Sequence, residues 1–331
     1  MSIAKATAVA YSNIAFVKFW GKRDAALNLP YNDSLSMNLS AATTTTTVIF
    51  DDTLAEDVVI IDGREERGGR RERVVAHLDR VRQMADIEAR ARVVSRNSFP
   101  MATGIASSAS AFAALSLAAT RAAGLDLDEG ELSRLARLGS GSACRSVPGG
   151  FTYWTAGTSH ETSFARQIAP PEHWDLRDVI AVVSQAPKAV GSGAGHAAAE
   201  TSLFFRARLV TLPQRLAEVK DALLARDLPT FGRAIEEEAI SLHVIAMTSR
   251  PPIYYWLPAT LQLIQAVQSW RAEGLEVYFT LDAGPNVHLI CRAGDQTEVE
   301  KRLTAMEEVR EVIVNQPAGG VRLLDEHLFD P

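Results

Sequence analysis

The stretch NSFPMATGIASSASAFAAL, residues 97–115, passes from the end of a strand through a loop into an apolar helix. Small residues fill the first turn of that helix, where bulkier apolar side chains would pack better. The free N–H groups at a helix start attract anions, and Gly104 would let one approach closely. The pattern therefore indicates a phosphate-binding loop, although a Ser/Ala helix packed tightly against a sheet explains it equally well. It matches neither the GxxxxGK[ST] loop nor GxGxxG after a first strand.

Around this stretch, strand and helix patterns mix without a regular βαβ alternation, which favours the α+β class. β-branched or alternating runs predict strands at residues 5–20, 42–52, 57–69 (with a charged hairpin loop), 91–97, 151–157 and 178–185. Apolar residues at helical spacing predict helices at residues 73–87, 106–123, 126–140, 198–225, 229–247 and 257–273. A Gly-Pro-Asn turn would join two strands within 276–292, and 311–324 are expected to form a closing strand pair.

Composition narrows the class of protein. The chain has 331 residues, which is enough for two lobes, and its net charge of -6 disfavours nucleic acid as a partner. Its two cysteines, Cys144 and Cys291, form no disulfide framework, and the scattered histidines show no transition-metal spacing. No run of about 18 apolar residues and no signal-peptide core are present, so we expect no membrane span and a cytoplasmic location.

A Gly/Ser cluster surrounds one arginine in GSGSACRSVPGGFTYW, residues 139–154. The Arg145 guanidinium is a fork-shaped donor suited to a carboxylate or phosphate, and the Gly-Ser-Gly-Ser run offers an anion nest. A flexible loop with a solvated arginine is the alternative, and the density of the cluster favours the functional interpretation.

Two more stretches place charged groups at strand ends. Lys18 and Lys22 follow the first strand in AYSNIAFVKFWGKRD, residues 10–24, and Asp282 ends an apolar strand in TLDAGPNVHLI. An acid there can act as a base or orient a hydroxyl. Taken alone, a solvated lysine and a turn-forming aspartate are the simpler interpretations of these residues.

Together the four stretches resemble the GHMP kinase superfamily, whose phosphate loop reads P-x-x-x-G-x-x-S-S-A, and within it the mevalonate diphosphate decarboxylase family. The matching segments run from residue 11 to 290 in the family's order, and SGSACRS and KFWGKRD are specific to the decarboxylases. The resemblance implies a ribosomal-S5-like N-terminal lobe over residues 1–186 and a ferredoxin-like C-terminal lobe over 187–331, with the active site in the cleft. It also implies ATP-dependent phosphorylation of a tertiary 3-hydroxyl, followed by loss of phosphate and CO₂.

The resemblance also implies residue roles. Asp282 would orient or deprotonate the 3-hydroxyl, Arg145 would hold the substrate carboxylate with support from Asn13, and Lys18 would lie near the transferring phosphate. The ATP phosphates would bind at Pro100, Gly104, Ala106, Ser107 and Ser108, and Ser108 would contact Mg²⁺. The phosphorylated end of the substrate and its surroundings would involve Tyr11, Lys22, Ser140, Gly141, Ser142, Arg145, Ser192 and His196.

One loop departs from the family pattern. In PKAVGSGAGHAAAET, Gly193 lies where many diphosphate-specific members carry an arginine, and His196 lies where methionine is usual. Losing that arginine removes a hydrogen bond worth roughly 1.5–3 kcal/mol. The departure favours (R)-5-phosphomevalonate as substrate, giving isopentenyl phosphate, ADP, phosphate and CO₂. Lys188, Ser192 or His196 could compensate, which leaves (R)-5-diphosphomevalonate as the alternative.

Two further functions compete with decarboxylation. A 3-kinase without decarboxylation is disfavoured because Arg145 facing a carboxylate has little purpose in it, and a non-catalytic sensor is disfavoured by the intact Lys18 and Asp282. The resemblance further implies a homodimer, since the family is often dimeric.

Overall fold

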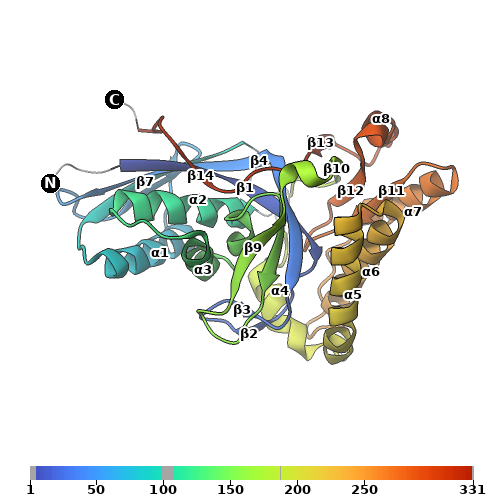
Figure 1. Ribbon diagram of the computed structural model, residues 1–331, viewed down its shortest axis with the longest axis horizontal. Coiled ribbons are helices and arrows are strands. Elements are labelled where there is room, and N and C mark those ends of the chain that lie inside the picture. Colours follow the sequence, from blue (N-terminus) through green and yellow to red (C-terminus); the bar gives the residue numbers. More distant parts are fainter. Residues whose placement is uncertain (1–4, 99–106, 187, 330–331) are drawn as a thin grey trace.

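The computed structural model describes residues 5–98, 107–186 and 188–329. Within this part, a larger sheet of eight strands fills the left and centre of Figure 1, and a four-stranded sheet with its helices fills the right. The structure confirms the predicted α+β class, because helices cover sheets without a regular βαβ alternation.

The larger sheet has the strand order β14-β1-β4-β7-β5-β6, and β8 pairs with both β4 and β9. Long antiparallel pairing of β1 with β4 forms its centre, and bulges interrupt that ladder near Tyr11 and Ala15. Its strands are β1 (Lys5–Val17), β4 (Ser34–Asp51), β5 (Val58–Ile61), β6 (Arg64–Glu65), β7 (Arg90–Asn97), β8 (Phe151–Thr155), β9 (Phe164–Ala169) and β14 (Arg322–Leu324).

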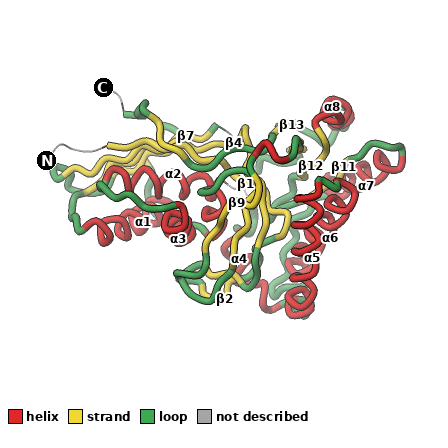
Figure 2. The backbone as a smooth tube through the Cα atoms, in the orientation of Figure 1, coloured by secondary structure: helices red, strands yellow, loops and turns green. Residues whose placement is uncertain are grey.

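Three helices cover one face of this sheet: α1 (Gly69–Ala85), α2 (Ser107–Ala122) and α3 (Glu129–Gly139) (Figures 1 and 2). The alanine-rich face of α2 packs into the core beneath the sheet. Asp128 begins α3 as one half of a capping box with Glu131. The 3₁₀-helix η1 (Gly141–Ser146) then turns the chain toward the centre of the molecule.

The smaller sheet has the order β11-β12-β10-β13 and is antiparallel throughout. Its strands are β10 (Leu176–Val182), β11 (Val277–Thr280), β12 (Val287–Arg292) and β13 (Glu311–Asn315). Around it lie α4 (Ser192–Ala198), α5 (Phe205–Ala225), α6 (Leu228–Met247), α7 (Pro258–Ala272) and α8 (Gln296–Thr304), and a small β2 (Lys22–Asp24) and β3 (Leu29–Pro30) ribbon lies below the centre.

The two parts share a core. Phe16 of β1 meets Phe231 of α6 edge-to-face, with ring centroids 4.8 Å apart, and Trp174 packs on the same ring. Buried residues of β1, β4, α5 and α6 join one continuous cluster. Helix α6 therefore lies directly against the C-terminal half of β1, which is where the strand delivers its functional residues.

Several segments differ from their predicted structure. Residues 311–324 form two strands that do not pair with each other, because β13 pairs with β10 while β14 pairs with β1. Strand β10 precedes residue 186 yet belongs to the smaller sheet, and β14 near the C-terminus returns to the larger sheet, so the sheets do not divide the chain at a single point. The charged loop expected within 57–69 is only partly a loop, since it contains the short strand β6 and ends where α1 begins at Gly69. The helix expected over 198–225 is broken, and α5 begins only at Phe205.

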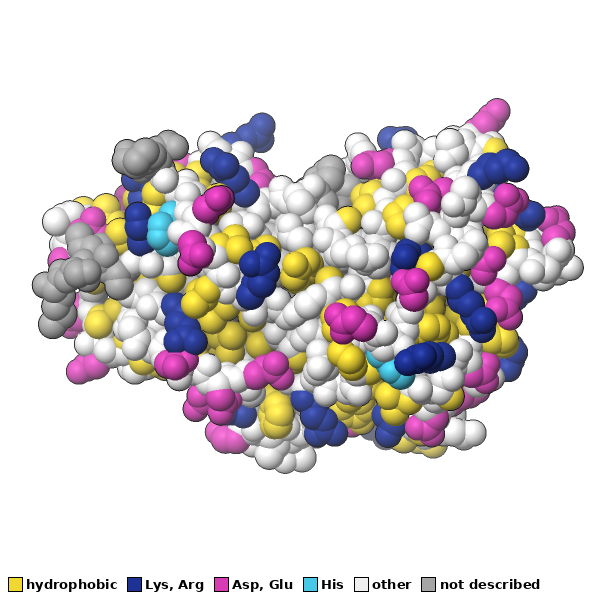
Figure 3. Space-filling model, turned by 45° about the horizontal axis from the view of Figure 1, so that its top comes forward, with side chains coloured by type: hydrophobic (Ala, Val, Ile, Leu, Met, Phe, Trp, Pro, Cys, Tyr) yellow, Lys and Arg dark blue, Asp and Glu magenta, His cyan; other side chains and the backbone are white. Residues whose placement is uncertain are grey.

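Among the described residues, no helix is long and apolar enough to cross a membrane. Figure 3 shows acidic and basic side chains interspersed over one face of the molecule rather than gathered into a single basic surface.

Candidate active site

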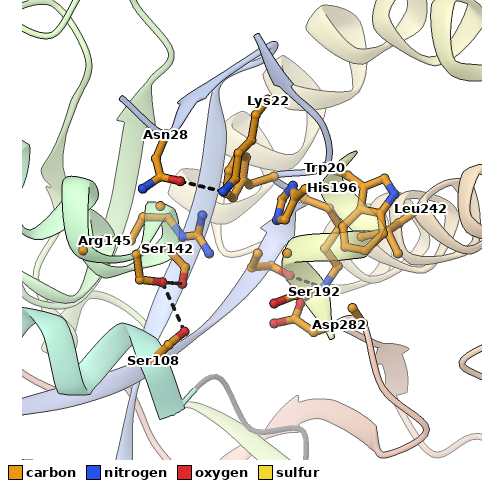
Figure 4. Close-up of a pocket in the computed structure, with 18 of the residues that line it drawn as sticks. Trp20, Lys22, Asn28, Ser108, Ser142, Arg145, Ser192, His196, Leu242 and Asp282 are labelled. Atoms are coloured by element: carbon orange, nitrogen blue, oxygen red, sulfur yellow. Dashed lines mark hydrogen bonds and ion pairs between the residues drawn. The ribbon is translucent and has the colours of Figure 1, made fainter. Parts of the chain in front are cut away.

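A cavity of ≈ 520 Å³ lies between the two parts of the molecule. Its walls come from the end of β1, the start of α2, the 3₁₀-helix η1, helix α4 and the turn after β11 (Figure 4). Most of the predicted site residues line this one cavity: Lys18, Lys22, Ser108, Ser140, Gly141, Ser142, Arg145, Ser192, His196 and Asp282.

Lys18 and Asp282 form an ion pair at the cavity wall, with Nζ and Oδ1 2.9 Å apart. The Lys18 side chain is 1% exposed, whereas Asp282 is 25% exposed and so keeps a face toward the cavity. Burial lowers the pKa of Lys18, although Asp282 and Glu238 act in the opposite direction. Burial alone would raise the pKa of Asp282, but the attraction of Lys18, His288 and Arg145 outweighs it and the pKa is lowered. Asp282 is therefore an anion at neutral pH.

Arg145 lies on the opposite side of the cavity from Asp282 (Figure 4). Its Nε donates to Asn13 Oδ1 at 3.1 Å and its Nη1 donates to Ser34 Oγ at 3.1 Å. The guanidinium also lies over the Trp154 ring, 5.6 Å from the centroid. Burial lowers the pKa of Arg145 from its usual high value, but a guanidinium remains charged in proteins. These interactions fix its plane and leave part of the fork facing the cavity.

Asn13 supports Arg145 from behind and does not line the cavity. Its amide nitrogen donates to Ser146 Oγ at 2.7 Å and to the Ser142 carbonyl at 3.2 Å, while its oxygen accepts from Arg145. This arrangement fixes the orientation of the amide and ties β1 to η1. Tyr11 lies farther back on β1, half-buried beside Thr43, and is likewise not part of the cavity lining.

Three serine hydroxyls meet at the end of the cavity nearest α2. Ser108 Oγ lies 3.1 Å from Ser140 Oγ, which lies 3.5 Å from Ser142 Oγ (Figure 4). Ser108 stands in the first turn of α2, where the helix dipole favours an anion. Pro100, Gly104 and Ala106, together with the Ser107 side chain, lie outside the described residues.

Positive charge on this side comes from residues distant in the sequence. Lys22 Nζ donates to Asn28 Oδ1 at 2.6 Å, and Asn28 in turn donates to the carbonyls of Arg137 and Leu138. Burial and the neighbouring Arg73 lower the pKa of Lys22. Asn28 and Arg73 also line the cavity, although neither was among the site residues predicted from the sequence. No sequence pattern marks Arg73 as a site residue, because the charged segment around it is typical of a solvated loop.

His196 packs between Phe19 and Trp20, with ring centroids 4.1 and 4.8 Å away. Its Nδ1 accepts from the Gly21 N–H at 3.1 Å, so the opposite nitrogen carries the proton in the neutral ring. Burial, Lys22 and Arg145 lower the pKa of His196 to about 3, which keeps it neutral at physiological pH. It is therefore a neutral donor beside the cationic groups. Ser192 and Gly193 precede it on α4, both exposed at the rim.

A second cavity of ≈ 150 Å³ adjoins the first and shares Arg73 and Ser108 with it. Most of its remaining walls are apolar, including Val59, Val74 and Phe112. These apolar walls suit an aromatic ring.

No group of three or more His, Cys, Asp or Glu side chains that could hold a metal ion was found in the described part of the chain. Ser108 lines the cavity and offers a neutral oxygen donor of the kind that Mg²⁺ accepts.

Two family models match the chain in succession. One, described as diphosphomevalonate decarboxylase-like N-terminal domain, matches residues 10–165, and the other, described as mevalonate 5-diphosphate decarboxylase C-terminal domain, matches residues 178–318. A protein of Candida albicans named diphosphomevalonate decarboxylase is 38% identical over 311 residues, which cover 89% of this chain and 86% of the relative. A protein of Homo sapiens with the same name is 39% identical over 308 residues, covering 86% of this chain and 76% of the relative. Among solved structures, one described as MDDEF in complex with MVAPP, AMPPCP and magnesium is 38% identical, with a TM-score of 0.91 over 98% of this chain and 100% of that chain.

Proposed function

This chain belongs to the diphosphomevalonate decarboxylase family, and we propose that it converts (R)-5-diphosphomevalonate and ATP to isopentenyl diphosphate, ADP, phosphate and CO₂. It is an ATP-dependent decarboxylase of a phosphorylated mevalonate. The observation that carries the proposal is the Lys18–Asp282 pair and Arg145 on opposite sides of one cavity.

The expectation of a 5-phosphomevalonate substrate is wrong, because the relatives at 38% and 39% identity are diphosphomevalonate decarboxylases. The absence of an arginine at position 193 therefore does not indicate a monophosphate substrate. Lys22, Arg73 and Lys188 also line the cavity, so positive charge for a second phosphate comes from other parts of the chain.

The first half of the proposed reaction is phosphoryl transfer. The 3-hydroxyl oxygen attacks the γ-phosphorus of ATP, the bond from that phosphorus to the leaving ADP oxygen breaks, and the hydroxyl proton passes to Asp282. Because its pKa is lowered, the Asp282 carboxylate is a weak base but still accepts a hydrogen bond. It is therefore suited to orienting the hydroxyl, since a loose transition state demands little proton transfer. Lys18 and Lys188 would balance the charge of the moving phosphoryl group, since both line the cavity together with Asp282.

The second half is elimination. The C3–O bond breaks and its electron pair leaves with phosphate, while the bond to the carboxylate carbon breaks and its pair forms the new double bond, releasing CO₂. Phosphate leaves far more readily than hydroxide, which is why the first half must come before the second. Asn13 and Ser34 accept hydrogen bonds from Nε and Nη1 of Arg145. The remaining guanidinium N–H groups face the cavity and would hold the substrate carboxylate in line.

The nucleotide would bind across both cavities. The apolar second cavity suits the base, and the shared Arg73 and Ser108 suit the phosphates between it and the substrate. Mg²⁺ would neutralise phosphate charge there, with Ser108 as its protein ligand.

We further propose that the protein is a cytoplasmic homodimer. Supporting the dimer, eight exposed large apolar side chains of the described residues fall within 203–261: Leu203, Phe204, Val210, Leu224, Ile240, Tyr254, Leu257 and Leu261. Sedimentation equilibrium of the wild type and of Tyr254→Asp tests the dimer, and a wild-type monomer at micromolar concentration would contradict it.

The decisive assay offers (R)-5-diphosphomevalonate, with ATP and Mg²⁺, and follows ADP and CO₂ in parallel. Equal amounts of ADP and CO₂ are expected, with (R)-5-phosphomevalonate as the comparison substrate giving a lower kcat/KM. ADP without CO₂ would mean a kinase, and no turnover of the diphosphate would overturn the proposal.

A further inference from the structure

Lys18 is held by its backbone as well as by its side chain. Strand β1 ends at Val17, so the peptide groups of Lys18 have left the sheet ladder. Its N–H donates to Glu238 Oε1 at 3.1 Å, and its carbonyl accepts from Arg208 Nη2 and from Asn32 Nδ2, each at 3.1 Å. Side chains from α5 and α6 thus provide the backbone pairing that a neighbouring strand would otherwise provide.

Arg208 and Glu238, which hydrogen-bond to the Lys18 backbone, form an ion pair with each other. Arg208 Nη2 donates to Glu238 Oε1, and the two side chains are 1% and 0% exposed. Arg215 binds the other carboxylate oxygen at 3.2 Å and is 20% exposed. Burying such a pair adds little net stability compared with apolar residues of the same size, because both charges lose their hydration. Its presence therefore requires another reason.

Helix α6 also fixes the partner of Lys18. Glu236, two residues before Glu238, accepts from the Phe279 N–H at 3.1 Å, and Phe279 precedes Asp282 by three residues at the end of β11. His243, one turn farther along α6, makes a hydrogen bond with the Asp282 backbone. One rigid helix thus sets the position of both the lysine and the aspartate.

We propose that Arg208 and Glu238 are positioning residues, which fix the Lys18 backbone so that its ammonium group reaches Asp282 in the catalytic geometry. The reason is geometric: the ammonium group donates to both the Ala15 carbonyl and Asp282, and it can reach the two acceptors together only if the Lys18 backbone keeps its position. Lys18 sits at the junction of the two sheets, where neither sheet alone orders it. This inference rests on the proposed function.

The test replaces the buried pair with apolar side chains of similar size, in the double variant Arg208→Met/Glu238→Met. Such replacement is often tolerated by the fold, whereas removing one partner alone would leave a buried charge. Arg215→Ala is the matched control, because it removes an ion-pair partner of Glu238 while keeping both hydrogen bonds to the Lys18 backbone.

In the double variant, kcat is expected to fall at least tenfold, with the KM for ATP changed less than threefold. The acid limb of the kcat/KM profile should also move to higher pH, because a displaced Lys18 no longer lowers the pKa of Asp282. The other charged or titratable groups that face Asp282 are Arg145, Lys188, His243 and His288, and the substitutions leave them all unchanged.

A second measurement does not depend on turnover. Amide hydrogen exchange at Lys18 should accelerate at least tenfold in the double variant and stay near the wild-type rate in Arg215→Ala. A folded double variant with wild-type kcat, acid limb and exchange would overturn the inference, as would a loss of kcat without the change in exchange and acid limb. If the wild type itself does not turn over diphosphomevalonate, the proposed function fails, and the exchange result alone then decides whether this pair fixes Lys18.

Discussion

Arg145→Lys tests whether a fork-shaped cation is needed at the carboxylate end of the cavity. The guanidinium uses Nε for Asn13 and Nη1 for Ser34, at 3.1 Å each, and has further N–H groups for a ligand. An ammonium group is a single nitrogen, which cannot reach both acceptors and also hold a carboxylate in two places.

The size of the effect follows from the hydrogen bonds that a lysine cannot make. One charge-assisted hydrogen bond to the substrate carboxylate is worth about 1.5–3 kcal/mol, which corresponds to a decrease of roughly 10- to 150-fold in kcat/KM. Asn13 and Ser34 are 1% and 0% exposed, and leaving either acceptor without its donor costs about 1–3 kcal/mol of folding stability.

The assay follows ADP and CO₂ together, with the KM for ATP measured at saturating substrate. We expect the KM for ATP to stay within about twofold, because Ser108 and Arg73 are unchanged. Arg82→Lys is the matched control, since Arg82 is a buried guanidinium that binds Asp57 and lines neither cavity. It should lower stability and leave kcat intact. A kcat/KM for Arg145→Lys within threefold of the wild type would refute the role given to Arg145.

Asp282→Asn should lower kcat by about 10²- to 10⁴-fold while ATP still binds in calorimetry, and near-normal turnover would remove its assigned role. Gly195→Ala should raise the KM for substrate and lower the melting temperature, because a Cβ there would lie 2.4 Å from the Trp20 ring. Gly193→Ala, where a Cβ meets nothing within 4 Å, is its control, and equal behaviour of the two variants would contradict the packing argument. Burial lowers the pKa of His77 from 6.5 to about 3, so its contribution to stability is complete above pH 6.5 and is lost on acidification toward pH 3. Between pH 7 and pH 5 the free energy of unfolding, measured in urea, should fall by about 2 kcal/mol more in the wild type than in His77→Gln. Equal decreases in the two proteins would contradict a lowered pKa for His77.

The sequence alone determined the features that depend on neighbours along the chain. Apolar spacing placed α2, α3, α6 and α7 close to their observed bounds. The α+β class and the family were likewise within reach, because the motifs around Lys18, Arg145 and Asp282 are short and contiguous. These signals are local, and so is the physics of helix periodicity and capping.

Only the tertiary structure decided which distant segments meet. Nothing in EVIVNQPAGGVRLL says that its two strands join different sheets, because strand pairing depends on a partner that the local pattern does not specify. Arg73 looks like a solvated charge until α1 brings it to the cavity wall, whereas Tyr11 of the first strand does not line the cavity. Lys18 shows the same limit most clearly, since its backbone partner Glu238 lies 220 residues away. A buried charge is stabilised by whatever the completed fold packs against it, and a linear sequence does not contain that information in any one segment.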